Sequence, residues 1–392
     1  MRVAVVNKLL VPAGSARWST GWSLGLKELG HEVTTVFIRE AASASRITGL
    51  LKNQPYTSYL TGAKARLSEL VGLPAVQWWM QGAFDRDSSP DPISWALAPI
   101  IGSWKGKYDL LLAHDEYTGL GCLIAHKLYG TPYVVNFAEA IADVEPYPLR
   151  SPLRVLRAEV GGNAILRVAN SSRVAQSYVK AFGFPVEVIP TGCTPAANVN
   201  VEKHHYILAD TRWTTWRDPF FLLDVAERAH AIEFVLAGTF ASMELERQWN
   251  DEVRRRGLTN RIRRAVSPDE PALISLYRNA LAYVRWAARA PGLPPESGVP
   301  SGIFQSLSQG CPFIIDDSIS VEPTIRSRFQ KWIVPFNADS FAQAILTLAT
   351  DPALARTVAA LAWTTSKELS WTARAADLIQ KVKTKIGGNP AV

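Results

Sequence analysis

The sequence predicts an α/β protein made of two Rossmann-like halves, each with a parallel sheet and helices on both faces. Three observations carry this prediction. Short apolar runs alternate with helix-like periodicity, the alternation starts again after residue 199, and a polar stretch without periodicity separates the two series. With 392 residues, of which 47% are hydrophobic, the chain is long enough for two domains with a sizeable core each.

The first series begins at the N-terminus. Its expected strands are 3–6, 33–37, 110–113 and 133–137, and its expected helices are 20–29 and 120–129. Residues 45–107 interrupt the series with tryptophans, prolines and scattered basic side chains. This aromatic-rich insertion fits two descriptions. One is an acceptor-side segment at a membrane interface, where Trp and basic side chains are favoured, and the other is a helical subdomain with an aromatic core.

The second series follows the polar stretch 195–202, which we interpret as an interdomain linker. Its expected strands are 206–208, 233–236, 282–284 and 313–315, and its expected helices are 220–229 and 243–256. We therefore expect an N-terminal domain at 1–197, a C-terminal domain at 198–370 and a C-terminal helical segment at 371–392.

Composition and charge limit the partners and the compartment. The net charge of +7 favours acidic partners, such as sugar nucleotides or an anionic membrane surface, and the basic run at 254–264 lacks the interleaved aromatic residues of a nucleic-acid site. No apolar run is long enough for a membrane span, and the first residues lack a secretion signal, so we expect a cytoplasmic protein. Three scattered cysteines suit reduced thiols, and no metal-binding spacing is present.

A loop rich in Gly, Pro and Ser leads into an amphipathic helix near residue 301. The backbone N–H groups of Ser301, Gly302 and Ile303 would be free at the start of this helix, where the macrodipole is positive, so an anion could bind there without a metal ion. The alternative is an ordinary loop, helix and strand of an α/β protein.

Five separated segments support a more specific prediction. The first is Gly14 before a helix that leads to 30–33. The second comprises 108–115 and 130–135, and the third comprises 169–172 and 188–192. The fourth is Arg212 with Arg217 five residues on, and the fifth is the loop and helix at 296–312, followed by Trp371. Together they resemble the retaining glycosyltransferases of family four. The resemblance implies the GT-B fold, in which two Rossmann-like domains face each other across a cleft and the final helix returns to the first domain.

The resemblance also implies a function. Such an enzyme moves a sugar from a nucleotide-diphosphate sugar, with UDP or GDP as the expected nucleotide, to a hydroxyl group of a glycan, a lipid-linked acceptor or a small molecule. It needs no metal ion or other cofactor. Arg212 and Arg217 would hold the diphosphate through bidentate bonds, aided by Gly14 and the helix start. The alternative for the two arginines is a surface salt bridge with Asp210 or Asp218.

The chain departs from the family pattern at its acidic positions. Ser297 and Gln305 stand where the family has two glutamates; Gln305 can still bond ribose, and Glu296 could replace the missing carboxylate. Ala138 stands at the position of the family's active-site His and is followed by Glu139. A retaining reaction, which the resemblance favours, needs no protein base. An inverting one does, and Glu139 or Asp143 could serve.

His114 and Asp115 are further acceptor-side candidates, because they follow an expected strand, where open α/β sheets bind ligands. A structural His that caps the next helix is the alternative. Two other functions stay open. One is a nucleotide-sugar epimerase. The other is a catalytically impaired relative that binds a nucleotide sugar or a partner protein, which the lost acidic residues favour. A peripheral position on the inner membrane face is also consistent with the charge.

Overall fold

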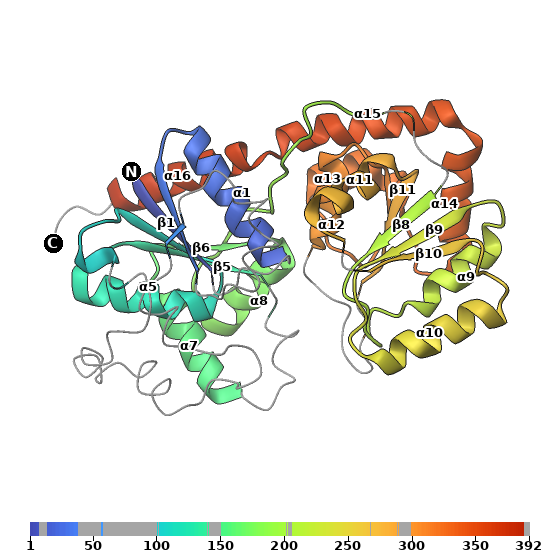
Figure 1. Ribbon diagram of the computed structural model, residues 1–392. Coiled ribbons are helices and arrows are strands. Elements are labelled where there is room, and N and C mark those ends of the chain that lie inside the picture. The colour runs from blue at the N-terminus through green and yellow to red at the C-terminus, as the bar shows by residue number, and fades with distance from the viewer. Residues whose placement is uncertain are drawn as a thin grey trace. The chain divides into compact units, whose positions relative to one another are not determined.

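The computed structural model describes residues 1–7, 14–37, 56–57, 100, 102–138, 140, 150–200, 202, 206–266, 268–287, 289 and 299–387. It divides into two compact units. Unit 1 comprises Met1–Gly192 with Trp371–Val392, and unit 2 comprises Cys193–Ser370. Each unit has its own parallel β-sheet with helices packed against it (Figure 1).

The sheet of unit 1 has seven strands in the order β3-β2-β1-β4-β5-β6-β7, and all of its neighbouring strands are parallel. The central strands β4 and β5 are completely buried, which explains their unbroken apolar sequence. The strands are β1 (Arg2–Asn7), β2 (Glu32–Phe37), β3 (Tyr56–Thr57), β4 (Leu110–Ala113), β5 (Tyr133–Phe137), β6 (Leu166–Ala169) and β7 (Glu187–Val188).

The helices of unit 1 pack against this sheet and form two apolar clusters with it. One cluster includes the stacked rings of Phe137 and Tyr178, whose centroids lie 3.8 Å apart. The other includes Trp22 and Trp371, and Trp371 begins the last helix of the chain, which packs on the first. The helices are α1 (Gly14–Glu28), α5 (Glu116–Tyr129), α7 (Arg150–Asn163), α8 (Ser172–Phe182) and α16 (Trp371–Gly387).

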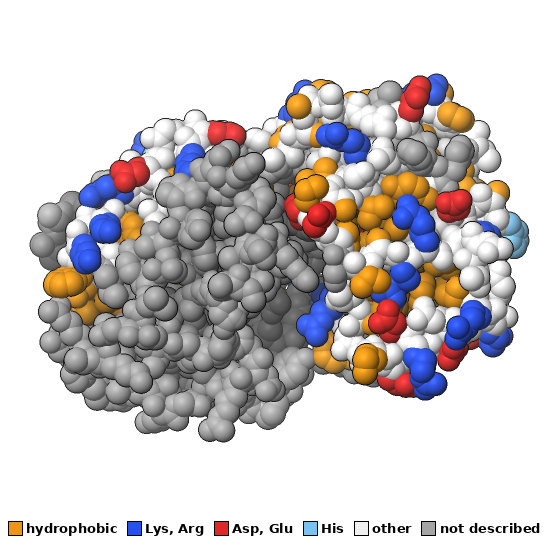
Figure 2. All heavy atoms as spheres, viewed as in Figure 1, with side chains coloured by type: hydrophobic (Ala, Val, Ile, Leu, Met, Phe, Trp, Pro, Cys, Tyr) orange, Lys and Arg blue, Asp and Glu red, His pale blue; other side chains and the backbone are white. Residues whose placement is uncertain are grey.

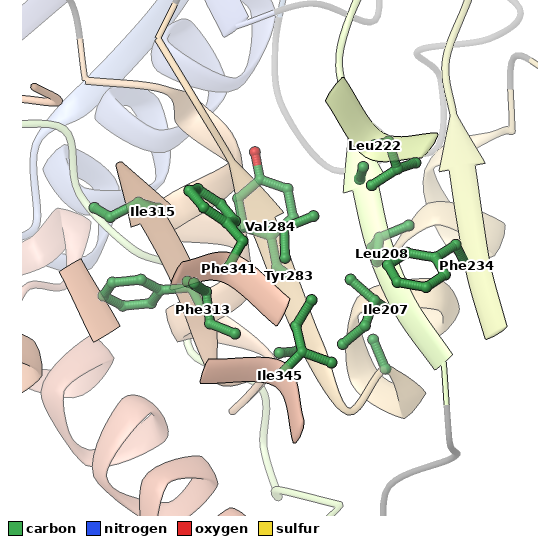
Figure 3. Packing of buried hydrophobic residues seen from close by; sticks show 14 of the residues in the cluster. Ile207, Leu208, Leu222, Phe234, Tyr283, Val284, Phe313, Ile315, Phe341 and Ile345 are labelled. Atoms are coloured by element: carbon green, nitrogen blue, oxygen red, sulfur yellow. The ribbon is translucent and has the colours of Figure 1, made fainter. Parts of the chain in front are cut away.

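The sheet of unit 2 has six parallel strands in the order β10-β9-β8-β11-β12-β13. Its core lies between the sheet and the helices, and Figure 3 shows Phe341 and Ile345 of α14 (Ala338–Thr350) beside the strand residues Ile207 and Phe313. The strands are β8 (Tyr206–Asp210), β9 (Glu233–Ala237), β10 (Ile262–Ala265), β11 (Ala282–Arg285), β12 (Phe313–Asp316) and β13 (Ile333–Val334). The other helices are α9 (Phe220–Arg228), α10 (Met243–Arg255), α11 (Glu270–Asn279), α12 (Ser301–Ser308), α13 (Pro323–Phe329), η2 (Gln330–Trp332) and α15 (Pro352–Glu368).

The predicted fold class, two Rossmann-like α/β halves, is confirmed. Two helices start earlier than predicted. The helix expected at 20–29 begins at Gly14, and the helix expected at 120–129 begins at Glu116, because Asp115 caps it. Cys122, Cys193 and Cys311 are buried free thiols. Within the described residues no single helix has the length and apolarity of a membrane span; α14 and α15 reach them only when taken together, across a bend of 104°.

Candidate functional site

The candidate site lies at the carboxyl edge of the sheet in unit 2. The strand order reverses between β8 and β11, and open α/β sheets bind ligands outside the carboxyl ends of the strands at such a switch point. The described segments that reach this edge include the loop 211–219 after β8, residues 286, 287 and 289 after β11, and the start of α12.

The loop after β8 is held in an extended course beside the end of β9. Trp213 is buried, its N–H donates to Thr239 O at 2.8 Å, and its indole Nε1 donates to Ala237 O at 2.8 Å. Gly238 makes the close approach possible, since a Cβ there would lie 2.1 Å from Thr211 O. The anchored loop exposes Arg212, whose side chain has no hydrogen bond or ion pair within the described part of the chain.

Arg217 lies further along the same loop and is partly buried. Its N–H donates to Thr214 Oγ1 at 3.0 Å. Hydrogen bonds are described for both carboxylates that the sequence offered as salt-bridge partners. Asp210 accepts from the Tyr277 hydroxyl at 3.0 Å, and Asp218, whose pKa is raised by desolvation, accepts from the Phe220 N–H at 2.9 Å.

Helix α12 presents an uncapped N-terminus to this edge. Pro300 stands at the N-cap without a side-chain hydrogen bond, and the first turn holds no acidic residue. The expectation of three free N–H groups needs a correction, because the Ile303 N–H donates to Pro300 O at 3.1 Å. The N–H groups of Ser301 and Gly302 are the two that an anion could use.

The position of α12 depends on Gly302. A Cβ at this residue would lie 2.3 Å from the Tyr283 hydroxyl oxygen and 2.8 Å from that of Tyr277, so only glycine allows the helix start to lie against both hydroxyls. Tyr277 in turn donates to Asp210 at the end of β8. Gln305 lies one turn further along α12 and is partly buried.

Sequence reasoning missed three charged residues at the same edge. Arg285 ends β11 with 5% of its surface exposed, Asp316 ends β12 with 0% exposed, and Arg289 pairs with Asp316 at 3.1 Å. The signal was present in the sequence, because a charged residue at the end of an otherwise apolar strand is costly to bury unless it is paired.

The carboxyl edge of unit 1 holds the acceptor-side candidates. Asp115 is the N-cap of α5: its Oδ1 accepts from the Thr118 N–H at 2.9 Å, so the helix is capped by Asp115 rather than by His114. The His114 ring meets Trp18 edge-on with centroids 4.8 Å apart, and its Nδ1 lies 3.6 Å from Asp115 Oδ2.

Three asparagines that the prediction missed mark the same edge. Asn7 ends β1, Asn136 lies in β5, and Asn170 directly follows β6. The Asn136 amide donates to His114 O at 3.1 Å, and the Asn170 amide donates to Ala138 O at 3.0 Å. An amide inside a buried strand such as β5 was the available signal, since buried polar groups need hydrogen-bond partners.

Gly14 is the first residue of α1. Glu139, Asp143, Glu296 and Ser297 lie outside the described residues. In the part of the chain that the structure describes, no three His, Cys, Asp or Glu side chains lie close enough together to hold a metal ion.

Residues 13–192 match the model of the glycosyl transferase 4-like domain. No curated protein sequence matches the chain. Solved structures do: HepE from Anabaena in complex with UDP is 16% identical over 98% of this chain and 100% of that chain, with a TM-score of 0.70. The chain has the GT-B fold.

Two other GT-B neighbours agree with this assignment. A glycosyltransferase from Rickettsia africae ESF-5 is 16% identical over 99% of both chains, with a TM-score of 0.70. The sucrose-phosphate synthase from Thermosynechococcus elongatus is 14% identical over 99% of this chain and 100% of that chain, with a TM-score of 0.67. Identities this low show the fold, and together with the matched domain they support a glycosyltransferase.

Proposed function

We propose that this protein is a nucleotide-sugar-dependent glycosyltransferase that works without a metal ion, with the donor in unit 2 and the acceptor hydroxyl in unit 1. The observation that carries the proposal is the uncapped start of α12 at the same sheet edge as the loop of Arg212 and Arg217. The Anabaena neighbour binds UDP and UDP-glucose, which supports a nucleotide sugar as the ligand here.

The chemistry of the donor fits these groups. Transfer of the sugar leaves a nucleoside diphosphate, UDP or GDP, and its negative charge grows in the transition state. The guanidinium groups of Arg212 and Arg217 can each bond phosphate oxygens in pairs, while the Ser301 and Gly302 N–H groups add fixed dipoles. The Gln305 amide can bond ribose hydroxyls. Fixed cations of this kind make a divalent ion unnecessary.

The acceptor side has a different chemistry. Asparagine amides both donate and accept hydrogen bonds, so the edge with Asn7, Asn136 and Asn170 suits a ligand rich in hydroxyl groups, such as a glycan or the sugar head of a lipid-linked acceptor. We favour a retaining reaction, which needs no protein base. In an inverting reaction, Glu139 or Asp143 would take the proton of the acceptor hydroxyl.

The first test is the Arg217→Ala variant. It should lower kcat/KM at least 100-fold, about 3 kcal/mol of transition-state stabilisation, comparable to the loss of one oxyanion donor. Arg247→Ala is the matched control, since Arg247 is an exposed arginine of α10 in the same unit. Wild-type turnover by the Arg217 variant would refute the diphosphate role.

Ligand binding separates the alternatives. UDP and GDP sugars at 100 times their Kd should each add about 2.7 kcal/mol to stability if they bind, which thermal unfolding detects. A donor that is converted without any acceptor would favour an epimerase. A donor that binds and is never transferred, whatever acceptor is offered, would favour a catalytically impaired binding protein.

The opposite edge of unit 1, where β1, β4 and β5 begin, supports contact with an anionic membrane. Six of its large apolar side chains are exposed, namely Met1, Leu29, Trp104, Leu128, Tyr129 and Ile386. Exposed lysines lie among them, namely Lys105, Lys107, Lys127, Lys383 and Lys385. Figure 2 shows Lys and Arg beside hydrophobic side chains at the end of unit 1 that holds the N-terminus in Figure 1. Aromatic and basic side chains are both favoured at a lipid interface.

Vesicles test this contact. The protein should float with vesicles of phosphatidylcholine and phosphatidylglycerol at low salt, and less at high salt. Each lysine near an anionic surface is worth about 1 kcal/mol, so Lys105→Glu with Lys107→Glu should weaken binding more than tenfold. The control, Lys331→Glu with Arg356→Glu, makes the same charge change on exposed residues of unit 2 and should bind like the wild type. Equal losses of vesicle binding in both double variants would mean that net charge, rather than this edge of unit 1, causes the binding.

A further inference from the structure

Asp316 is a buried carboxylate at the end of β12, with 0% of its surface exposed. Its Oδ2 accepts from the Ala287 N–H at 2.5 Å, and its Oδ1 accepts from the Ser318 N–H at 2.9 Å and from Arg289 Nη2 at 3.1 Å. The Ser318 hydroxyl also donates to Oδ1. This carboxylate therefore gathers donors from the two segments that follow β11 and β12.

Arg289 joins this carboxylate to the loop after β8. Its Nη2 also donates to Ser318 Oγ at 3.0 Å, and its guanidinium lies over the Phe336 ring, 4.2 Å from the centroid. Its backbone N–H donates to Trp216 O at 2.8 Å. A continuous path of hydrogen bonds thus runs from Asp316 through Arg289 to the residue directly before Arg217.

The energetics favour a fixed geometry. A carboxylate without solvent exposure is costly to leave unpaired, so the Asp316 charge holds the Arg289 guanidinium in place. The Phe336 ring below the guanidinium leaves it little freedom to turn. With its side chain held in this way, the Arg289 backbone gives the Trp216 carbonyl a fixed donor.

We propose that Arg289 and Asp316 are positioning residues that set the place of Arg217 on the donor diphosphate. This inference rests on the proposed function, because it assigns Arg217 to that ligand. Arg289 acts through the loop and does not touch the nucleotide. Neither residue belongs to the sequence motifs that predicted the donor site.

The test uses Arg289→Met and a matched control, Arg328→Met. The Arg328 side chain is 32% exposed, as is that of Arg289, and it pairs with Glu368 at 2.8 Å in the same unit. Binding of UDP and of GDP is measured by calorimetry on the full chain, together with the unfolding midpoint without nucleotide. We expect Arg289→Met to weaken binding of the preferred nucleotide about tenfold and Arg328→Met to leave it unchanged. Arg289→Lys, which keeps a cation beside Asp316 and protects the fold, should fall between the wild type and Arg289→Met.

A double-mutant cycle with Arg217→Ala identifies the route of the effect. If Arg289 acts through Arg217, the Arg289→Met change has no further effect in the Arg217→Ala background. An additive loss would mean direct contact with the nucleotide and would overturn the positioning role. Unchanged affinity in both Arg289 variants would overturn the inference while the proposed function stands. A wild-type protein that binds neither nucleotide would overturn both.

Discussion

Helices α5 and α12 occupy the same place in the two units, but their first turns differ in charge. Helix α5 follows β4, which lies beside β1, the first strand of its sheet. Helix α12 follows β11, which lies beside β8, the first strand of the other sheet. In each sheet the strand order reverses between these two strands. Helix α5 starts with the Asp115 cap followed by Glu116. Helix α12 starts after Pro300, with no side-chain cap and no acidic residue in its first turn. The same topology thus gives one helix start that its own carboxylate caps and one that has no side-chain cap within the described residues and that we propose binds the donor diphosphate.

The residues around the two helix starts follow the same division. The edge of unit 1 carries the neutral amides of Asn7, Asn136 and Asn170, whereas the loop after β8 at the edge of unit 2 carries Arg212 and Arg217. Neutral amides suit hydroxyl groups and guanidinium groups suit phosphates. Charge at the carboxyl edge, rather than strand order, therefore distinguishes the proposed acceptor side from the proposed donor side.

The largest effects are expected from substitution of a glycine near the start of each helix. A Cβ at Gly302 would meet two tyrosine hydroxyls, and a Cβ at Gly119 of α5 would lie 2.4 Å from Val160 Cγ1. We expect Gly302→Ala and Gly119→Ala each to destabilise the protein by about 2 kcal/mol through overpacking, as measured by urea unfolding. Only Gly302→Ala should also weaken nucleotide binding. Equal nucleotide affinity in both variants would separate α12 from the donor site.

Giving α12 an acidic cap like that of α5 tests directly whether the start of α12 binds the nucleotide. Pro300→Asp places a carboxylate at the N-cap, where it can accept hydrogen bonds from the backbone N–H groups that would otherwise bind the phosphate. We expect UDP or GDP to bind about tenfold more weakly, a loss of about 1.4 kcal/mol, with stability unchanged or raised. Pro300→Ala, which removes the proline without adding charge, is the control and should bind like the wild type. A Pro300→Asp protein with wild-type affinity would mean that the anion binds elsewhere.

The smallest expected effect comes from removal of the cap in unit 1. Asp115→Ala should lower the free energy of unfolding by about 1 kcal/mol, because the Thr118 N–H loses its acceptor. Asp115→Asn keeps an acceptor and should cost less. Calorimetry should find nucleotide affinity unchanged in both variants, and a large loss in either would place Asp115 on the donor side.

The helix at the proposed donor side could be predicted from local sequence. The Gly, Pro and Ser residues before a periodic apolar pattern predicted a helix near residue 301, and the structure starts α12 at Ser301 with Ile303 and Phe304 buried. Arg212 and Arg217 were chosen because their spacing resembles that of the glycosyltransferase family, and their role on the diphosphate stays a prediction. The Ile303 N–H was wrongly expected to be free, because the turn that joins it to the Pro300 carbonyl is set by the backbone conformation of the loop and leaves no mark in residue types.

By itself, the sequence determined the two α/β halves, the parallel sheets and the cationic segment after β8, because alternating hydrophobicity and residue spacing are local properties. Only the tertiary structure decided which charges meet. Arg289 and Asp316 stand 27 residues apart and pair because β11 and β12 are neighbours in the sheet. Likewise, Gly302 became necessary only when α12 came to lie against the hydroxyls of Tyr277 and Tyr283. Such contacts depend on which elements pack together, and the free energy of burying a charge or a ring is fixed only once they do.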